Sequence, residues 1–264
     1  MKQPSTLSEF YTQSPPAGYI QLTVNGRSVV VCQWAAAAIR DLLAEHTLHN
    51  WASTQIDHVQ MHGRGINYGV ILPAGVKPGE STPIVVRRNR HGGLLGSITG
   101  EYFRMPSRAP IELSNSLRLK SAGINTTEVI AYALYPAFMH FVRCDVVTRR
   151  LPDGGDLPDV WRSAESSSRE AMLIVVARLL RDLALTGAWH ADLNLKNIYI
   201  AGHGSALTAY LLDVDRVTFP ECNNIAELNF KRLARSARKW RIKWGLDFDE
   251  KAIERLAALI LEMN

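Results

Sequence analysis

Three polar residues near position 190 stand at a spacing that suits phosphoryl transfer. In the stretch TGAWHADLNLKNIYI, His190, Asp192 and Asn197 follow the pattern H-x-D-x-x-x-x-N, after an apolar helical run and before a short β-branched run. Phosphoryl transfer requires an oriented acceptor hydroxyl and phosphates whose charge is held by metal. An aspartate can accept the hydroxyl proton, and an asparagine later in the same loop can ligate magnesium. Asp192 is therefore the candidate base and Asn197 a candidate metal ligand.

The motif alone also fits an ordinary polar loop. In that interpretation His190 and Asp192 cap neighbouring backbone groups and have no part in catalysis. We expect His190 to be structural, holding the loop through its backbone or through Asp213.

A second acidic site follows in the stretch YLLDVDR, where an apolar strand ends in Asp213 and Asp215. Magnesium prefers oxygen ligands and shares them with phosphates. A carboxylate at a strand end, just beyond a short hairpin from the asparagine, lies where a kinase places its metal-binding aspartate. This order favours Asp213 as a metal ligand over a simple solvated turn. The sequence does not decide how Asp213 and Asp215 share the metal.

A cation for the phosphates is expected upstream. The apolar strand TPIVVRR ends in Arg87, in the place where kinases carry a strand lysine, and arginine can hold phosphates bidentately. Glu112, in the helix predicted next, is the natural partner of that cation. The alternatives are an edge-strand charge for Arg87 and a solvated helix face for Glu112, because charged side chains usually lie in water.

Two glycines precede that strand, Gly63 and Gly65 in HGRGINYGV, between two predicted strands. Glycines allow backbone N–H groups to approach phosphate oxygens closely. An ordinary hairpin turn explains the pair equally well in isolation. Their order along the chain favours a nucleotide-binding role.

Composition limits the class of protein. The chain has 264 residues, 47% hydrophobic and 21% charged, which indicates a folded protein with one large domain or two lobes. The net charge of +5 favours an anionic partner: a nucleotide, a nucleic acid or an acidic lipid. Three distant cysteines without a C-x-x-C pair argue against zinc or redox chemistry and fit a reducing cytoplasm. No signal peptide or bilayer-spanning run is visible, so any membrane association is expected to be peripheral.

The order of predicted elements indicates an α+β fold with two lobes. Residues 1–55 are expected to form an N-terminal extension, with a hairpin at Asn25-Gly26 and one helix over AAAAIRDLLAEHTLHNW, joined to the first lobe. Residues 56–150 are predicted to form a β-rich N-lobe with one helix, SRAPIELSNSLRLKSAG. Residues 151–264 are predicted to form a mainly helical C-lobe with basic C-terminal helices. The stretch PDGGDLPD is predicted to be a loop at the boundary. This is the order of a two-lobed kinase, in which a cleft between the lobes holds the nucleotide.

Several of these segments together resemble the lipopolysaccharide kinases, most of all the 3-deoxy-D-manno-octulosonic acid (Kdo) kinase branch, with the core heptose kinases as relatives. The segments are VVRRNRHGGLLG, SRAPIELSNSLRL, HADLNLKNIYI, LLDVDR and NFKRLARSARKW, within roughly residues 60–240. The resemblance implies a protein-kinase-like fold, ATP and magnesium as cofactors, and a sugar hydroxyl on a lipid A precursor as acceptor. The resemblance implies that Asp192 is the catalytic base and that Asn197 and Asp213 are the metal ligands. It also implies that Arg87 is the strand cation and Glu112 its helix partner. The family pattern R-x-Y-R-R-G-G appears here as RRNRHGG, which leaves the acceptor open.

A basic helix is predicted near the C-terminus. AELNFKRLARSARKWRIKWG carries seven Lys or Arg and one Glu, with an apolar stripe from Phe230 to Trp244. The basic face could meet lipid A phosphates or inner-leaflet lipids, or could simply be solvated. No nucleic-acid module is visible, so nucleic acid is the least favoured partner. The candidate contacts to an anionic substrate are Arg88, Arg90, Lys231, Arg232 and Arg235.

The sequence hypothesis is an ATP- and Mg²⁺-dependent kinase that phosphorylates a Kdo hydroxyl on a lipid A precursor in lipopolysaccharide inner-core biosynthesis. We expect it in the cytoplasm, peripheral on the cytoplasmic face of a bacterial inner membrane. The alternatives are a phosphotransferase for core heptose, another small molecule or a protein, and a membrane-associated pseudokinase. The expected charged positions are all filled, which argues against an inactive enzyme.

Overall fold

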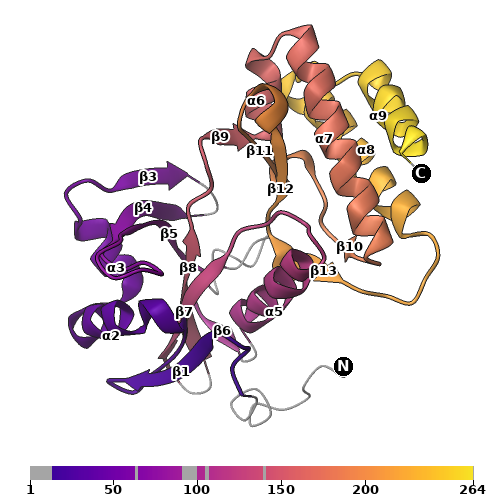
Figure 1. Cartoon of the computed structure of the whole chain (residues 1–264). Coiled ribbons are helices and arrows are strands. Elements are labelled where there is room, and N and C mark those ends of the chain that lie inside the picture. Colours follow the sequence, from indigo (N-terminus) through magenta and orange to yellow (C-terminus); the bar gives the residue numbers. More distant parts are fainter. Residues whose placement is uncertain (1–13, 63–64, 91–99, 105–106, 139–140, 264) are drawn as a thin grey trace. The chain divides into compact units, whose positions relative to one another are not determined.

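The chain divides into two compact units. The computed structural model describes residues 14–62, 65–90, 100–104, 107–138 and 141–263. Unit 1 consists of Met1–Ser114 and Glu128–Arg150, and unit 2 consists of Asn115–Thr127 and Leu151–Asn264. The short segment Asn115–Thr127 therefore belongs with the second unit, although the strands on either side of it in the sequence belong to the first. Figure 1 shows the elements of both units along the chain.

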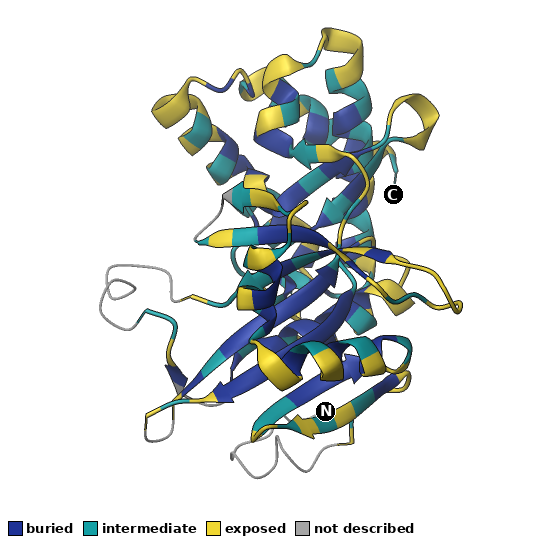
Figure 2. Cartoon of the chain, turned by 90° about the vertical axis from the view of Figure 1, so that its left-hand side faces the viewer, coloured by how far each residue is buried: buried dark blue, intermediate teal, exposed yellow. Residues whose placement is uncertain are grey.

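Unit 1 is built on one antiparallel sheet. Its strand order is β1-β2-β7-β8-β5-β4-β3, and β6 also pairs with β8. Figure 2 shows the middle strands of this sheet as buried along most of their length, as expected for strands covered on both faces. The strand bounds are β1 Tyr19–Val24, β2 Arg27–Cys32, β3 Val59–His62, β4 Ile66–Leu72, β5 Thr82–Arg88, β6 Phe103–Arg104, β7 Val129–Pro136 and β8 Phe141–Arg149.

The N-terminal hairpin forms one edge of this sheet. Asn25 and Gly26 connect β1 to β2 with φ values of 49° and 74°, as the Asn-Gly signal predicts for a two-residue hairpin loop. Strand β2 pairs with β7, so that Val29 lies opposite Ala133, about a hundred positions later in the chain. Both side chains are fully buried. The extension is thus part of the core of unit 1.

The helix predicted after the hairpin is interrupted. A short 3₁₀ turn η1 (Gln33–Ala35) leads into α2 (Ala36–Glu45), and a separate helix α3 (Leu48–Thr54) follows. Thr47 divides them because its side chain accepts a hydrogen bond from the backbone N–H of Asn50, as an N-cap does. The prediction of one continuous helix here was wrong. The next predicted helix is confirmed as α5 (Arg108–Ser121), with Pro110 in its first turn.

Unit 2 is mainly helical, as predicted. Its helices are α6 (Leu157–Ser163), α7 (Ser166–Leu185), α8 (Ile225–Trp244) and α9 (Glu250–Glu262). Two small sheets accompany them, β12-β11-β9 and β10-β13. The strand bounds are β9 Gly154–Asp156, β10 Trp189–His190, β11 Ile198–Ala201, β12 Thr208–Leu211 and β13 Val217–Thr218, and short 3₁₀ turns are η2 Leu195–Asn197, η3 Gly204–Ala206 and η4 Val214–Arg216. The buried face of α7 packs on these strands and on α8 and α9 to form one apolar core.

The stretch PDGGDLPD is more ordered than the expected loop. It contains β9, which pairs with β11, and the first residues of α6. Gly154 explains the pairing, since a Cβ at this position would lie 2.0 Å from the carbonyl oxygen of Ile200. A glycine that sequence analysis assigns to a flexible loop therefore permits a close approach of two strands.

Among the helices that the structure describes, none combines the length and the apolar character that a bilayer span requires.

A buried carboxylate ties α3 to the sheet of unit 1. Asp145, in β8, is 0% exposed; its Oδ2 accepts the backbone N–H of His49 at 3.0 Å and its Oδ1 accepts Nε of Arg88 at 3.2 Å. Beside it, the backbone N–H of Leu48 donates to the hydroxyl of Tyr135 at 3.0 Å. The first turn of α3 has free N–H groups that need acceptors, and β7 and β8 supply them.

We expect Asp145→Ala to destabilise the protein by about 3 kcal/mol, because it removes the buried partner of Arg88 and leaves the His49 N–H unsatisfied. Urea denaturation followed by circular dichroism measures the change. Glu128→Ala is the control, since its ion pair with Arg149 is partly solvated and is expected to contribute less than about 1 kcal/mol. Equal losses in the two variants would contradict a special role for Asp145.

Candidate active site

The ring of His190 holds the backbone of the candidate base. His190 is fully buried at the end of β10, and its Nδ1 accepts the backbone N–H of Asp192 at 3.1 Å. Its Nε2 lies 3.1 Å from the carbonyl oxygen of Leu212. Because Nδ1 must accept, the proton is on Nε2, which donates to Leu212. The neutral imidazole therefore connects the loop of Asp192 to the residue before Asp213, through backbone groups as expected.

Burial lowers the pKa of His190 below its ordinary value. The hydrogen bond to Leu212 and the nearby carboxylates, Asp213 first, act in the opposite direction on this pKa. The net direction keeps the ring neutral at pH 7, which is the state that the two hydrogen bonds require.

Two amides converge on the carbonyl oxygen of Asp192. Asn197 donates Nδ2 to it at 2.8 Å, and Asn194 donates Nδ2 at 3.0 Å. These bonds fix the loop between β10 and η2 around the candidate base. They also orient the amide of Asn197, whose Nδ2 is used within the loop and whose Oδ1 is left to act as a ligand.

Asp213 lies at a sharp turn immediately after β12. Its φ of 52° is left-handed, a conformation that aspartate tolerates better than most residues. The turn is held on both sides by Asn115, whose Nδ2 donates to the carbonyl oxygens of Val214 and Val217, each at 2.8 Å. Sequence analysis missed Asn115. Its only signal was a polar residue on the otherwise apolar side of a predicted helix.

Asn197 and Asp213 are brought together by the backbone. The carbonyl oxygen of Asn197 accepts the N–H of Leu212, the residue before Asp213, at 2.8 Å. Within the described residues, no side chain donates a hydrogen bond to the Asp213 carboxylate. Asp215 differs, because its carboxylate lies 3.8 Å from Nε of Arg216 and is 13% exposed. An amide oxygen and an unengaged carboxylate are hard oxygen donors, so the residues present fit magnesium, with Asp213 the better ligand of the two acids.

Helix α8 supports the loop from the other side. Asn229 is fully buried; it accepts the backbone N–H of His190 at 3.1 Å and donates to the carbonyl oxygen of Ala188 at 2.9 Å. Ser236, two turns later on the helix, accepts the N–H of Leu195 at 3.1 Å. Between them, Arg232 places Nη2 3.5 Å from Oδ1 of Asp192. Sequence analysis predicted Arg232 as a substrate contact but missed Asn229 and Ser236, because a polar residue in a basic helix carries no signal of burial.

A further acid, Asp156, interacts electrostatically with Asp213. Burial raises the pKa of Asp156, at the end of β9, and the charges of Asp159 and Asp213 raise it further, while Lys196 acts against them. Sequence analysis had placed Asp156 in the boundary loop. Burial is therefore the main cause that favours the neutral form of Asp156.

Unit 1 carries the predicted cation and its partner. Arg87, near the end of β5, forms an ion pair between its Nη2 and Oε1 of Glu112 in α5. The Glu112 side chain is 6% exposed and that of Arg87 is 25% exposed. The pair expected from strand and helix positions is thus formed within unit 1. Contact of Arg87 with a nucleotide remains a prediction.

The other basic residues near β5 are engaged within unit 1. Arg88 meets Asp145 and also Glu101, at 3.1 Å, and Arg90 donates to the same Glu101 at 2.8 Å. The structure therefore gives Arg88 internal partners, and Arg90, with 45% of its side chain exposed, is the better placed of the two to meet an anionic substrate. Gly65 allows Arg90 to lie close, since a Cβ there would be 3.1 Å from Cδ of the arginine. Gly63 lies outside the described residues.

The three predicted basic contacts of α8 differ in surroundings. Arg232 and Arg235 line a pocket beside Asp192. Lys231 does not line it and instead pairs with Glu227 one turn earlier on the helix. The roles of all three remain predictions.

Comparison with known proteins decides the family. The family model described as lipopolysaccharide kinase (Kdo/WaaP) family matches residues 79–259, well over half of the chain. The chain belongs to this family. The match covers both units and includes every predicted site residue except Gly63 and Gly65. The chain is therefore a kinase-type phosphotransferase with an alcohol group as acceptor, as the sequence resemblance implied.

Similar curated proteins carry one name. The 3-deoxy-D-manno-octulosonic acid kinase of Vibrio vulnificus (strain YJ016) is 26% identical over 201 residues, which are 74% of this chain and 78% of the relative. The protein of the same name from Photobacterium damsela subsp. piscicida is 26% identical over 69% of this chain and 75% of its own. That from Mannheimia succiniciproducens is 28% identical over 63% and 70%.

A solved structure shows the same fold. The structure titled WaaP in complex with acyl carrier protein covers 89% of this chain and 88% of its own, with a TM-score of 0.50 and 15% identity. At this identity the likeness concerns the fold alone. The protein-kinase-like fold expected from the sequence is confirmed.

The His190 bridge predicts a pH dependence. Because the folded-state pKa of His190 lies below the unfolded value of about 6.5, its contribution to stability is complete above that pH and is lost as the pH falls through the folded pKa. Protonation of Nδ1 also removes the acceptor for the Asp192 N–H. We expect the free energy of unfolding to fall more steeply between pH 7 and 5 in the wild type than in His190→Asn. The two slopes should differ by up to about 1.4 kcal/mol per pH unit.

The asparagine variant is chosen because its amide can accept and donate but does not titrate. Urea denaturation of both proteins at each pH gives the difference, in which the contributions of other titrating groups cancel. Parallel curves for the two proteins would rule out the proposed role of His190.

Proposed function

We propose that this protein is an ATP- and Mg²⁺-dependent kinase that phosphorylates a hydroxyl group of Kdo on a lipid A precursor. The observation that carries the proposal is the loop in which His190 and Asn197 fix Asp192 beside the Asp213 turn. This arrangement supplies a base and two oxygen ligands on one rigid scaffold. The family membership and the shared name of the similar curated proteins support Kdo as the acceptor sugar.

The residues of the chain take distinct parts in this proposal. Asp192 accepts a hydrogen bond from the acceptor hydroxyl and takes its proton as the oxygen attacks the γ-phosphorus of ATP, whose bond to the bridging oxygen breaks to release ADP. Asn197 and Asp213 hold magnesium, and when bound this ion neutralises charge on the ATP phosphates. Arg87, oriented by Glu112, binds phosphate oxygens. Arg232, 3.5 Å from Asp192, keeps the carboxylate in position before the acceptor arrives.

We further propose that the protein acts as a peripheral protein on the cytoplasmic face of the inner membrane, where a lipid A precursor is available. The end of α8 supports this location. Ile242 is 84% exposed, between the exposed cations Arg241 and Lys243. Apolar side chains flanked by cations suit the headgroup region of an anionic membrane.

Transfer of labelled γ-phosphate from ATP to Kdo–lipid A in detergent tests the function. We expect Asp192→Asn to lower kcat by about 10²- to 10⁴-fold, because the base is lost, while ATP-induced thermal stabilisation persists. No transfer by the wild type to Kdo–lipid A, with transfer to a heptose-containing acceptor or a protein instead, would reject Kdo as the acceptor. No thermal shift with ATP and Mg²⁺ would favour a pseudokinase.

The two acids of the D-x-D turn form a matched pair for the metal. We expect Asp213→Asn to lower kcat by at least about a hundredfold and to raise the Mg²⁺ concentration needed for half-maximal activity. Asp215→Asn should have a smaller effect on that concentration, because Asp215 lies beside Arg216. A larger shift in the Mg²⁺ requirement for Asp215→Asn would exchange the two assignments.

The membrane location predicts that Ile242→Glu weakens binding to vesicles containing anionic lipid by about tenfold, as expected for losing one buried isoleucine. Leu261→Glu is the matched control, since Leu261 is 74% exposed near the end of α9 and has no cation next to it in the sequence. Vesicle sedimentation measures both. The prediction fails if the two variants bind alike, or if neutral and anionic vesicles bind the wild type equally.

A further inference from the structure

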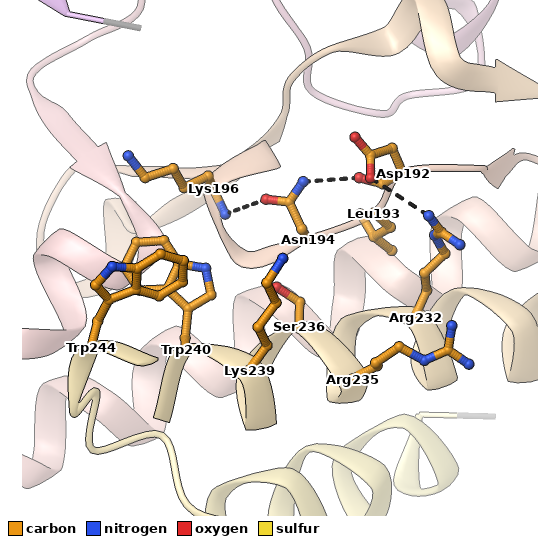
Figure 3. Close-up of a pocket in the computed structure, with 10 residues that line it drawn as sticks. All are labelled: Asp192, Leu193, Asn194, Lys196, Arg232, Arg235, Ser236, Lys239, Trp240 and Trp244. Carbon is orange, nitrogen blue, oxygen red and sulfur yellow. Dashed lines mark hydrogen bonds and ion pairs between the residues drawn. The ribbon is translucent and has the colours of Figure 1, made fainter. Parts of the chain in front are cut away.

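A pocket of about 620 Å³ opens beside Asp192 in unit 2. Its walls are the loop that follows β10 and one side of α8, and Figure 3 shows Arg232 and Lys239 extending from the helix toward that loop. A volume of this order suits a ligand of one or two sugar rings. The residues proposed above to contact ATP or metal do not line this pocket, whereas the candidate base Asp192 does.

The charge of the lining is strongly positive. Four cations, Lys196, Arg232, Arg235 and Lys239, face one carboxylate, Asp192. Arg232 is the cation that approaches Asp192, and its Nε is buried without a partner in the described residues. Arg235 and Lys239 are exposed, and no carboxylate of the described chain forms an ion pair with either. Like charges gathered without counter-charges favour an anionic ligand.

Two indoles complete the pocket. The rings of Trp240 and Trp244 lie 4.3 Å apart between centroids and are tilted by 42°, and Nζ of Lys196 lies 5.7 Å from the centre of the Trp240 ring. Trp240 packs partly on the core, whereas Trp244 is 51% exposed. An exposed indole among cations offers a flat apolar face next to charge. That combination matches a sugar ring, which has an apolar C–H face and polar substituents at its edge.

We propose that this pocket, the α8 pocket, binds the acidic saccharide of the acceptor. The carboxylate or phosphate of the sugar lies among Arg235, Lys239 and Lys196, and its C–H face packs on Trp244. The hydroxyl to be phosphorylated then reaches Asp192, in an orientation set by the anchored acidic group. This assignment of ligand rests on the proposed function of Asp192 as the base.

Arg232 gains a second role in this arrangement. Without an acceptor its guanidinium approaches Asp192, and with an acidic sugar in the pocket it can turn toward the sugar's anionic group. The buried Nε then has the acceptor that it otherwise lacks. Arg232 is in this sense a positioning residue for both the base and the sugar.

Direct binding to the full chain tests the pocket with lipid-free probes. Tryptophan fluorescence is titrated with Kdo, which carries a carboxylate, with glucose 6-phosphate, which carries a phosphate, and with glucose and inorganic phosphate. We expect saturable changes with one or both acidic sugars, and weaker binding of glucose and of phosphate alone. The comparison of Kdo with glucose 6-phosphate shows which anionic group the pocket selects.

Matched variants locate the binding. Lys239→Gln should weaken the binding of the acidic sugar about tenfold, as expected for losing one charge-assisted contact. Lys251→Gln is the control, because Lys251 is an exposed lysine on α9 outside the pocket. Trp244→Ala should weaken binding and reduce the fluorescence change. Equal affinities for Lys239→Gln and Lys251→Gln, or no acidic sugar bound by the wild type, would overturn the proposal.

Kinetics with Kdo–lipid A in detergent separate this proposal from the proposed function. In Lys239→Gln and Trp244→Ala we expect a raised KM for the acceptor with an unchanged KM for ATP. If the wild type transfers phosphate but these KM values do not move, the function stands and the pocket is rejected. If the wild type does not use Kdo–lipid A but the binding pattern above is observed, the acceptor is wrong and the pocket stands.

Discussion

The imidazole of His190 is the interaction on which the candidate site depends. Its two nitrogens connect the Asp192 N–H to the Leu212 carbonyl oxygen. Asp192 is the candidate base, and Leu212 is followed by Asp213, a candidate metal ligand. A loop that carries a candidate catalytic carboxylate needs a fixed backbone, although this loop contains no long helix or strand of its own. A fully buried ring with two backbone partners achieves this. It does so only while the ring is neutral, and burial therefore serves the geometry as well as the core.

Helix α8 divides its faces between support and recognition. Asn229 and Ser236 point at the loop and satisfy backbone N–H groups that would otherwise be buried without acceptors. The neighbouring side presents Arg235 and Lys239 to the α8 pocket. Because both sets are on one helix, the cations that we propose to anchor an acidic group keep a fixed separation from the loop of the candidate base. This is the requirement for presenting one hydroxyl of a sugar in preference to its neighbours.

Sequence reasoning reached what local signals encode. The Asn25-Gly26 hairpin follows from a few adjacent residues, and the structure contains it. The H-x-D-x-x-x-x-N spacing is also local, and in the structure His190 and Asn197 both hydrogen-bond to the backbone of Asp192. The pairing of β2 with β7 joins segments about a hundred residues apart and has no local signal. Asn115 and Asn229 were missed for a related reason. Their importance comes from the backbone groups they meet, which only the tertiary structure brings near.

The basic run at residues 87–90 shows how a strand changes the meaning of a sequence pattern. Read along the chain, Arg87, Arg88 and Arg90 form one patch for one anion. In a pleated strand successive side chains point to opposite faces, so Arg87 meets Glu112 of α5 while Arg88 meets Asp145, its direct cross-strand neighbour. Asp145 also accepts the backbone N–H of His49 in the first turn of α3. One arginine is thereby committed to holding the N-terminal extension and the other to the ion pair expected of a kinase. Two consecutive charged residues in a strand therefore lie in different environments. The face on which each side chain lies indicates whether it can bind a ligand.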